Sequence, residues 1–475
     1  MIPGSEMAVV DANAAALGVS RKQLMESSGN AVAETVRAVA DPDARVTIVA
    51  GRGNNGGDAL VAARFLDADD LRVCLLGRPE SIGSDIAREN WDALEQAGYE
   101  TREVRDSTTL SLGDPDVVVD ALLGTGIRGA LREPTASAAA AINAADATVV
   151  SVDVPSGLDA ETGHLADSAV DPDRVVTFHE AKPGLDALSA PVTVADIGIP
   201  QAAHEFVERG DLLRLDREPV SHKGDHGEVL VVGGGPYTGA PALTAQAALR
   251  AGADLARVAC PAAVADEIQG YSESLIVRPV AGDRIEPGHV DRLAELAGAH
   301  DTLVVGPGLG AGAPTHDAVR GLLGAVSGPV VVDADALQVV PAVETDATLL
   351  CTPHQGELAE MGGPRREDWR ERRDAVASFA ADLGVTLLVK GRHDVVSNGD
   401  RTRVNRTGNP GMTVGGTGDV LAGVTGALAA RLDPVDAAAV GAYVTGRAGD
   451  LAATGEGAGL LATDLLETLP GALQR

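Results

Sequence analysis

The chain has 475 residues, a length that indicates two or three domains, and it contains 45% hydrophobic and 23% charged residues, as soluble globular proteins do. No apolar run approaches the ~20 residues that a membrane span needs, so we expect no membrane partner. The 69 acidic residues outnumber the 38 basic ones and give a formal charge of -31, which repels phosphate backbones and argues against a nucleic-acid partner.

Short apolar runs alternate with helical stretches in the first half of the chain. Helical patterns occur at Ser84–Ala97 and Pro134–Ala144, and two further helices come before the first run, the second of them beginning at the N-cap residue Ser20. The apolar runs are Val46–Ala50, Val73–Leu76, Val117–Asp120, Thr148–Asp153 and Val175–Phe178. Strands that alternate with helices predict βαβ units and a parallel sheet covered on both faces.

A second series of the same kind starts after Arg217. The stretch Arg209–Pro219 lies between the two series, is rich in charge and ends in proline, so we place a domain boundary there. The apolar runs of the second series are Val229–Val232, Leu255–Ala259, Leu303–Val305, Val330–Val332 and Leu387–Val389. We therefore predict an α/β protein with two tandem three-layer αβα domains, residues 1–213 and 214–475, that bind ligands at the carboxyl ends of their strands.

A glycine-rich loop, Gly51–Asp58 (GRGNNGGD), follows the first predicted strand. Its glycines would let the backbone approach a ligand, and the next helix would present N–H groups to a phosphate; a tight turn without a ligand is the alternative. Asp120 and Asp153 end two further strands, where each could simply cap a turn. Together with Asn55 and Ser156 they would instead supply oxygen ligands for a monovalent cation or magnesium.

Five blocks of the first half resemble the NAD(P)H-hydrate epimerase family. They are LMESSGNAVAE (Leu24–Glu34), GRGNNGGD, DALLGTGIRG (Asp120–Gly129), VDVPSGLDAETG (Val152–Gly163) and TFHEAKPG (Thr177–Gly184), the last of which contains Lys182. The resemblance implies a Rossmann-like fold and the interconversion of the two epimers of hydrated nicotinamide dinucleotides. It also implies that Asn55, Asp120 and Ser156 bind potassium. The implied contacts to the hydrated cofactor are Asn54, Asn55, Gly56, Gly57, Asp58, Gly124, Thr125, Gly126, Ile127, Arg128, Gly129, Ala130 and Asp153.

The chemistry of this epimerisation needs little covalent help from a protein. The ring carbon that carries the hydroxyl lies next to the ring nitrogen, whose lone pair can expel hydroxide or open the ring. A carboxylate that moves protons would suffice, and we expect Asp153 to be this catalytic residue.

The second half contains two loops that suggest anion binding. In Ser221–Gly235 a lysine and two histidines precede a strand, where they either contact an anion or are solvated loop residues; a helix then begins near Ala240. In Gly408–Gly423 (GNPGMTVGGTGDVLAG) glycines precede a helix that starts near Gly416, so N–H groups and a helix dipole can face a transferring phosphoryl group. Asp419 lies in the first turn of this helix, where it either caps the helix or takes a proton from an attacking hydroxyl.

The motifs KGDHG, YTGAP, PGLG, TPHxGE, VKG and NPGMTVGGTGD resemble ribokinase-like kinases and, more closely, the ADP/ATP-dependent NAD(P)H-hydrate dehydratase family. The resemblance implies that the ring hydroxyl is phosphorylated at the expense of ADP or ATP, with AMP and phosphate as products when ADP is the donor. Loss of the phosphate would restore NADH or NADPH, and magnesium would neutralise the phosphate charges. The implied nucleotide contacts are Lys390, Gly391, Arg392, His393, Asp394 and Gly418. The implied contacts to the hydrated dinucleotide are Ala240, Gly308, His354 and Asp419, with Asp419 also the catalytic base.

Three positions depart from the patterns of these families. Gln355 stands where proline is common, Ala59 stands where glycine is common, and the loop Gly391–Asp394 (GRHD) is unlike the usual small or threonine-rich version.

The leading hypothesis is a bifunctional isomerase and lyase that repairs nicotinamide nucleotides. The alternative is a ribokinase-like small-molecule kinase fused to a non-catalytic Rossmann binding module. TPHxGE and NPGMTVGGTGD occur together, which disfavours a simple kinase. The intact GRGNNGGD loop, Asp120 and Asp153 argue against a degenerate scaffold.

Composition also indicates the environment of the protein. Cys74, Cys260 and Cys351 are odd in number and far apart, and no basic region leads into an apolar stretch at the start of the chain, so we expect a cytoplasmic protein without disulfides or a zinc cluster. Of the 38 basic residues only four are lysines. Many carboxylates with few lysines are typical of proteins in concentrated salt, where the Debye length falls to ~3 Å at 1 M; an ordinary acidic protein is the alternative. We further expect a homo-oligomer.

Overall fold

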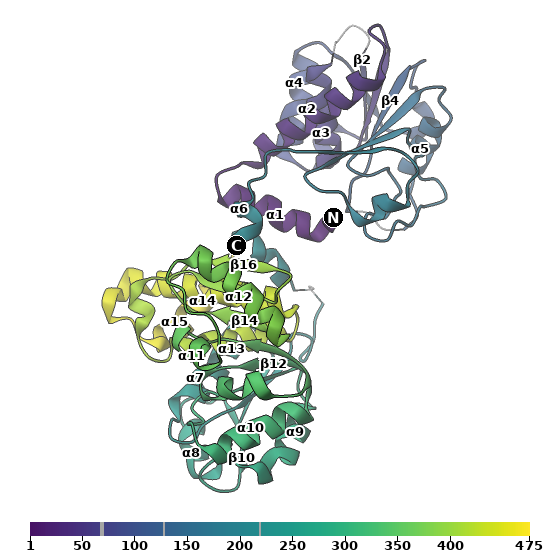
Figure 1. Cartoon of the computed structure of the whole chain (residues 1–475). Helices are drawn as coiled ribbons and strands as arrows, with labels where there is room; N and C mark the ends of the chain where they lie inside the picture. Colours follow the sequence, from purple (N-terminus) through teal and green to yellow (C-terminus); the bar gives the residue numbers. More distant parts are fainter. Residues whose placement is uncertain (67–70, 127–128, 218–219) are drawn as a thin grey trace. The chain divides into compact units, whose positions relative to one another are not determined.

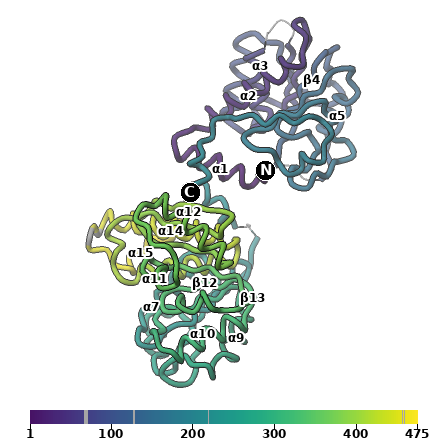
Figure 2. Tube along the Cα trace, viewed as in Figure 1, coloured from purple at the N-terminus to yellow at the C-terminus, as the bar shows by residue number. Residues whose placement is uncertain are grey.

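The computed structural model describes residues 1–66, 71–126, 129–217 and 220–475. The chain divides into two compact units, Met1–Ala203 and His204–Arg475, which lie in the purple-to-teal and the teal-to-yellow parts of the trace (Figure 1; Figure 2). Each unit contains its own mainly parallel sheet with helices. The predicted fold class, two tandem α/β domains, is therefore confirmed.

Seven parallel strands form the sheet of the first unit, in the order β3-β2-β1-β4-β5-β6-β7. The strands are β1 (Val46–Ala50), β2 (Leu71–Leu76), β3 (Glu100–Val104), β4 (Val117–Ala121), β5 (Thr148–Val152), β6 (Arg174–Phe178) and β7 (Val192–Ala195). The helices are α1 (Gly4–Ala16), α2 (Arg21–Val39), α3 (Asn54–Phe65), α4 (Asp85–Gln96) and α5 (Thr135–Asn143), and the short α6 (Ala202–Glu205) spans the division between the units. The strand order reverses between β1 and β4, and such a reversal opens a crevice at the carboxyl ends of a parallel sheet.

Alternation of side chains along each strand builds a core on both faces of this sheet. Ile48 and Val119 belong to the cluster that contains the buried side chains of α2 and α3, whereas Val49 and Val118 pack with those of α5. Helix α2 begins as the sequence predicts: Ser20 Oγ accepts from Gln23 N, and the Gln23 side chain accepts from Ser20 N at 2.8 Å, which is a capping box. The first unit thus has three layers.

The second unit contains a nine-stranded sheet in the order β10-β9-β8-β11-β12-β13-β14-β15-β16, of which β15 and β16 are antiparallel to their neighbours. The strands are β8 (Glu228–Val232), β9 (Leu255–Pro261), β10 (Ile276–Val280), β11 (Thr302–Val305), β12 (Ser327–Val332), β13 (Asp346–Cys351), β14 (Thr386–Val389), β15 (Asp394–Ser397) and β16 (Thr402–Asn405). The helices are α7 (Gly239–Arg250), α8 (Ala265–Gln269), α9 (Val290–Ala297), α10 (Ala313–Ala325), α11 (Gln355–Glu360), α12 (Trp369–Leu383), α13 (Thr417–Ala429), α14 (Pro434–Glu456) and α15 (Ala462–Ala472).

Two apolar cores lie on opposite faces of this sheet as well. Val231 and Val304 pack with the buried side chains of α7, α13, α14 and α15, while Leu230 and Leu303 pack with those of α9, α10 and α12. Within the described part of the chain, no helix combines the length and the apolarity that crossing a bilayer requires.

The structure places the division between the units ten residues before the predicted boundary at 213/214. Residues 204–213 pack with the second unit: Val207 N donates to Val404 O at 3.0 Å, and Leu212 belongs to the core that surrounds α14. The charge that made this stretch resemble a linker includes Asp211, which is fully buried and accepts from both Nη atoms of Arg403 at 3.0 and 2.8 Å. A buried, bidentate ion pair therefore joins this segment to β16.

This ion pair provides a test of the revised boundary. We expect Asp211→Asn to lower the free energy of unfolding of the second unit by about 3–5 kcal/mol, because the Arg403 guanidinium would remain buried without its counter-charge. Denaturant unfolding followed by circular dichroism measures the change. The control is Glu295→Gln, which breaks the exposed Arg292–Glu295 pair and should change the stability by less than about 0.5 kcal/mol. Equal effects of the two substitutions would contradict our assignment of residues 204–213.

Candidate active sites

In the first unit, polar side chains from three neighbouring strands meet at the carboxyl end of the sheet. Asp120 lies at the end of β4, and it is fully buried. Its Oδ1 accepts from Ser156 Oγ at 2.6 Å, and its Oδ2 accepts from Ser156 N at 2.9 Å and from Ser151 Oγ at 2.8 Å. Asn55, in the first turn of α3, donates from Nδ2 to Leu123 O at 2.8 Å. The predicted trio of Asn55, Asp120 and Ser156 therefore lies around the segment that follows β4 and contains Leu123.

The chain comes close to itself around this trio, as the glycines of the loop predict. A Cβ on Gly51 would lie 1.9 Å from Leu122 O, and a Cβ on Gly56 would lie 2.1 Å from Gly51 O. A Cβ on Gly124 would meet the Asn55 side chain at 3.3 Å. These glycines thus let the β1–α3 loop and the segment after β4 touch.

The residues of the trio fit a monovalent cation. Asn55 Oδ1 is buried and, among the described residues, has no hydrogen-bond partner, so an amide oxygen remains to be satisfied. Burial raises the pKa of Asp120, and the donors from Ser151 and Ser156 oppose this effect only in part. A cation held by the amide, hydroxyl and carboxylate oxygens would offset the cost of this buried carboxyl group.

Asp153 and Lys182 form a second group at the same end of the sheet. Lys182 Nζ lies 2.7 Å from Asp153 Oδ1 and donates to Thr177 Oγ1 at 2.9 Å and to Phe178 O at 3.0 Å. The Lys182 side chain is only 1% exposed. Asp153 has a φ of 63°, a left-handed conformation that a non-glycine residue adopts only where surrounding contacts hold it. The backbone at the end of β5 is therefore strained to direct this carboxylate.

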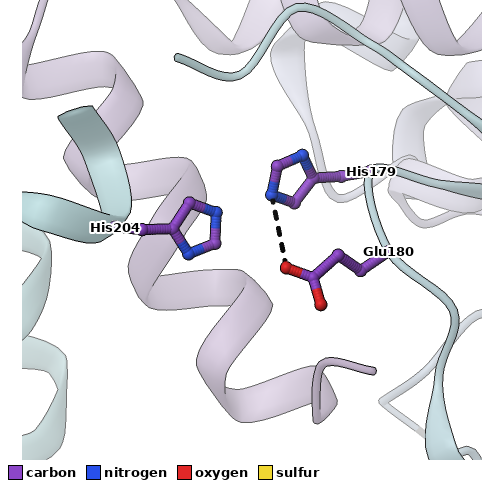
Figure 3. Close-up of side chains that lie close together, drawn as sticks. All are labelled: His179, Glu180 and His204. Atoms are coloured by element: carbon purple, nitrogen blue, oxygen red, sulfur yellow. Dashed lines mark ion pairs between the residues drawn. The ribbon is translucent and has the colours of Figure 1, made fainter. Parts of the chain in front are cut away.

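The turn after β6 brings Lys182 into this position. His179, the first residue after β6, has a φ of 64°, and its Nε2 lies 4.0 Å from Glu180 Oε1 (Figure 3). Three residues after His179, the Lys182 side chain returns to the last residue of the strand through its bond to Phe178 O. The turn thus folds the ammonium back onto the sheet.

Two further carboxylates interact electrostatically with this group. Burial raises the pKa of Asp58 well above its ordinary value, with the charges of Asp153 and Asp11 acting in the same direction and Lys182 opposing them. Burial also raises the pKa of Asp11, on α1, to about 6, against the charges of Arg21 and Lys182. Asp11 was not a predicted site residue, because nothing in the pattern of α1 separates it from an ordinary surface aspartate.

The other predicted cofactor contacts of the first unit have different surroundings. A Cβ on Gly57 would meet Met25 Cε at 2.8 Å and Ala87 Cβ at 2.9 Å, so this glycine makes room for helix packing. Thr125 lies against Gly4 of α1, whereas Cβ atoms on Gly126 and Gly129 would meet nothing within 4 Å. Asn54 and Ala130 are exposed. Ile127 and Arg128 lie outside the described residues.

The second unit gathers charged groups at the carboxyl ends of β12, β13 and β14. Lys390 Nζ lies 3.2 Å from Asp333 Oδ1 and 3.7 Å from Glu357 Oε2. Asp333 is 2% exposed and also accepts from Thr352 Oγ1 at 2.7 Å. Burial by itself would lower the pKa of Lys390, but the charges of Asp333, Glu357 and Asp419 together raise it. The ammonium is therefore firmly positive at neutral pH.

Asp419 lies in the first turn of α13 and interacts electrostatically with this ammonium. A Cβ on the preceding residue, Gly418, would lie 3.4 Å from Lys390 Nζ, which places the first turn of the helix beside the lysine. Burial raises the pKa of Asp419 to about 7; the charge of Asp333 adds to the shift and that of Lys390 opposes it. A carboxyl group with this pKa exchanges its proton near neutral pH, as a general base must.

His354 is held beside the same group by its backbone and by its ring. His354 N donates to Glu357 Oε2 at 2.7 Å, and Glu357 N donates to His354 Nδ1 at 3.0 Å, so the pair caps α11. Lys390 N donates to Pro353 O at 2.9 Å. The predicted dinucleotide contact His354 and the predicted nucleotide contact Lys390 thus lie on adjacent segments.

Gly308 and Ala240 approach this site from the neighbouring strands. A Cβ on Gly308, whose φ is 72°, would lie 2.3 Å from Tyr237 O, in the loop that leads into α7 and Ala240. Gly310 N donates to Asp335 Oδ2 at 2.9 Å, which ties the loop after β11 to the segment after β12. The predicted residues therefore border one region at the carboxyl ends of β8, β11 and β12.

The predicted nucleotide loop, Gly391–Asp394, is a tight turn closed by its own aspartate. Gly391 N donates to Asp394 Oδ1 at 2.9 Å, and Asn405 Nδ2 donates to Asp394 Oδ2 at 2.9 Å. Burial raises the pKa of Asp394 to about 6. The His393 ring stacks on Trp369 with a centroid distance of 5.3 Å, while Arg392 is exposed.

The lysine and the two histidines of the loop before β8 have different surroundings. His222 and Lys223 are exposed, while His226 Nδ1 lies 3.4 Å from Asp254 Oδ1. Gly224 N and His226 N also donate to Asp254 Oδ2, at 2.8 and 3.0 Å. Asp254 therefore already satisfies the buried histidine of this loop.

Sequence reasoning did not assign a role to Asp333 or Glu357. Glu357 lies in the motif TPHxGE, and Asp333 directly follows the predicted strand Val330–Val332. The rule that ligands bind at strand ends could have found Asp333. Ala334, the residue after Asp333, has a φ of 51°, so the backbone is strained directly beside this carboxylate.

Comparisons with known proteins match both units of the chain. A family model described as NAD(P)H-hydrate dehydratase matches residues 229–471, and one described as YjeF-related protein N-terminus matches residues 21–184. A protein of Methanothermobacter thermautotrophicus named bifunctional NAD(P)H-hydrate repair enzyme Nnr is 44% identical over 98% of this chain and 94% of its own length. A protein of the same name from Pyrobaculum aerophilum is also 44% identical, over 100% of this chain and 98% of its own length. The crystal structure of a ribokinase-like superfamily protein from Enterococcus faecalis is 23% identical, covers 57% of this chain and 95% of its own, and has a TM-score of 0.50; it supports the fold.

Proposed function

The chain belongs to the family of bifunctional NAD(P)H-hydrate repair enzymes, and on this premise we propose that it performs both reactions. The first unit interconverts the R and S epimers of hydrated NADH or NADPH, and the second unit dehydrates the S form with ADP or ATP as the phosphoryl donor. The observation that carries the proposal is the arrangement of Asp419 and Lys390 at the N-terminus of α13.

The dehydration follows from this arrangement. Asp419 accepts the proton of the ring hydroxyl, whose oxygen attacks the terminal phosphorus of the nucleotide and displaces AMP from ADP or ADP from ATP. Lys390 and the N–H groups of the first turn of α13 face the negative charge that this transfer moves. The ring nitrogen's lone pair then expels the phosphate, and loss of a proton from the neighbouring ring carbon restores the reduced nicotinamide.

Metal ions would assist at both sites. Asn55, Asp120 and Ser156 would hold potassium beside the hydrated cofactor, since they combine an unsatisfied amide oxygen with a hydroxyl and a buried carboxylate. Asp333 and Glu357 are carboxylate donors of the type that magnesium prefers. A bound magnesium ion would neutralise phosphate charge during the transfer.

In the epimerase site, Asp153 is the residue that moves protons. Its bond to Lys182 keeps the carboxylate in a fixed orientation, and Thr177 Oγ1 donates to the same oxygen at 3.0 Å. Asp58 lies close enough for its charge to interact with both groups, and burial raises its pKa well above the ordinary value, so a second carboxyl group would be available to the hydrated ring.

The high-salt environment, the cytoplasmic location and the homo-oligomeric state remain predictions from composition and resemblance. The surplus of 31 negative charges supports only the first of them.

Recovery of NADH absorbance tests the proposed function. We expect purified protein to convert an equal mixture of the R and S hydrates completely to NADH when ADP or ATP is present, with release of orthophosphate. Recovery of half of the absorbance would mean that the first unit does not epimerise. A stable phosphorylated product would instead indicate the alternative, a small-molecule kinase.

Substitution of the proposed base tests the second site. Asp419→Asn should lower the dehydration rate by roughly 10²–10⁴-fold while leaving nucleotide affinity and epimerisation unchanged, because the amide cannot accept the hydroxyl proton. In the unmodified protein the rate should rise as the pH increases through about 7 and then level off, because only the deprotonated carboxylate of Asp419 acts as a base. A variant with a near-normal rate would remove Asp419 from the mechanism.

Removal of the unsatisfied amide tests the cation site. Asn55→Ala should raise the potassium concentration that half-saturates epimerisation by roughly tenfold, because one buried oxygen ligand of the cation is lost. Epimer exchange measured over a range of potassium concentrations, with sodium keeping the ionic strength constant, gives this value. Dehydration of the pure S hydrate is the control and should not change; an equal loss of both activities would contradict separate sites.

A further inference from the structure

Arg372 is a buried arginine beside the predicted nucleotide loop that no step described above uses. It lies in the first half of α12 and is 3% exposed. Its Nη2 donates to His393 O at 2.6 Å, and a Cβ on Gly391 would lie 3.1 Å from the same nitrogen. The guanidinium therefore packs against the loop Gly391–Asp394 and bonds its backbone.

The same guanidinium also contacts the segment that begins α11. With the amide oxygen of Gln355 turned toward it, Arg372 Nη1 donates to that oxygen at 2.9 Å, and the Gln355 amide nitrogen donates to Arg366 O at 2.8 Å. Gln355 follows His354 directly and precedes Glu357 by two residues. One side chain thus bonds both the segment of the dinucleotide contact and the loop of the nucleotide contact.

The charge of Arg372 lacks a direct partner. Across the described ranges, no carboxylate lies within ion-pair distance of it, and its Nε is buried without a hydrogen-bond acceptor. Burial lowers the pKa of Arg372, while the charges of Asp394 and Asp368 act from further away to raise it. A buried cation that bonds only carbonyl-type oxygens is costly, which indicates a role beyond stability.

Other ties between these segments lie on the opposite side of the loop. Lys390 N donates to Pro353 O at 2.9 Å, and Lys390 Nζ lies 3.7 Å from Glu357 Oε2. These contacts fix the start of the loop, at Lys390. The far side of the loop, at His393, is joined to α11 through Arg372 and Gln355.

We propose that Arg372 is a positioning residue that sets the nucleotide loop against α11, so that the donor phosphate and the ring hydroxyl meet at Asp419. This proposal rests on the proposed function of the second unit. The planar guanidinium holds two acceptors in one fixed geometry, which a lysine ammonium does not reproduce. A displacement of about 1 Å between two reacting groups can reduce a rate by roughly 100-fold.

Of the two ends of this link, only the one at α11 depends on a particular side chain. Arg372 Nη1 donates to the amide oxygen of Gln355, whereas Arg372 Nη2 donates to the backbone carbonyl of His393, which any residue at that position would offer.

The test compares Arg372→Lys and Gln355→Leu with Arg373→Lys in the full chain. Arg373 is the next residue on α12, and it forms partly exposed ion pairs with Glu205 and Asp374 at 2.6 and 2.9 Å, so it serves as the matched control. The measurements are kcat and KM for ADP and for the S hydrate, the affinity for ADP by calorimetry, and the epimerisation rate of the same preparations.

We expect Arg372→Lys to lower kcat/KM for ADP by roughly 10–100-fold and Gln355→Leu by less, with epimerisation unchanged in both. Because the two residues form one link, the double variant should be no worse than Arg372→Lys alone. Arg373→Lys should match the unmodified protein. Normal ADP kinetics in a variant that still epimerises, or a double variant whose losses multiply, would overturn the proposal.

The unmodified protein separates this proposal from the proposed function. If it fails to dehydrate the S hydrate with either nucleotide, the proposed function is wrong, and the calorimetric affinities then decide the role of Arg372. A weaker affinity of Arg372→Lys for ADP would support the loop assignment, and an unchanged affinity would overturn it.

Discussion

Both sites depend on a lysine ammonium that is held against a carboxylate at the carboxyl end of a parallel sheet. Lys182 lies 2.7 Å from Asp153 in the first unit, and Lys390 lies 3.2 Å from Asp333 in the second. These are two of only four lysines in the chain, and the other two are exposed. A compact ammonium can donate to several oxygens in a narrow space, where the planar guanidinium of arginine does not fit. Lysine is therefore present where the site requires it.

The two units direct their carboxylates by the same physical means. Parallel strands bring polar residues from separate parts of the chain to one edge, and a strained residue then turns the backbone: Asp153 itself in the first unit, and Ala334, next to Asp333, in the second. The buried aspartates differ in their hydrogen bonds. Asp120 accepts from Ser156 and Ser151, whereas the described part of the chain places no donor within bonding distance of the Asp419 side chain. The donors to Asp120 therefore oppose part of the pKa rise that burial causes, whereas the pKa of Asp419 is raised to about 7 without such donors.

Much of the fold and of both sites could be predicted from the sequence. A parallel strand covered on both faces is a continuous apolar run, so most of the central strands, such as Val46–Ala50, were predicted, although Asp346–Cys351 was not. Glycines that allow close contact between segments can also be recognised in the sequence, as in the loop Gly51–Asp58. The edge strand Glu100–Val104 was missed because three of its five side chains are charged and exposed. The predicted boundary at 213/214 lies ten residues after the division that the structure shows, because a charged segment resembles a linker unless its partner, here Arg403 for Asp211, is known.

The sequence by itself determined which residue types stand at the strand ends, because local chemistry dictates them: glycines for close approach, aspartates and asparagine for oxygen donors, and Asp419 in the first turn of a helix. Only the tertiary structure decided which charges meet. Arg372 lies among several arginines on α12, and nothing in that pattern shows that one of them is buried between Gln355 and His393. Burial and the distances between residues far apart in the chain set both the pKa values and the links between segments, and these quantities exist only once the chain is folded.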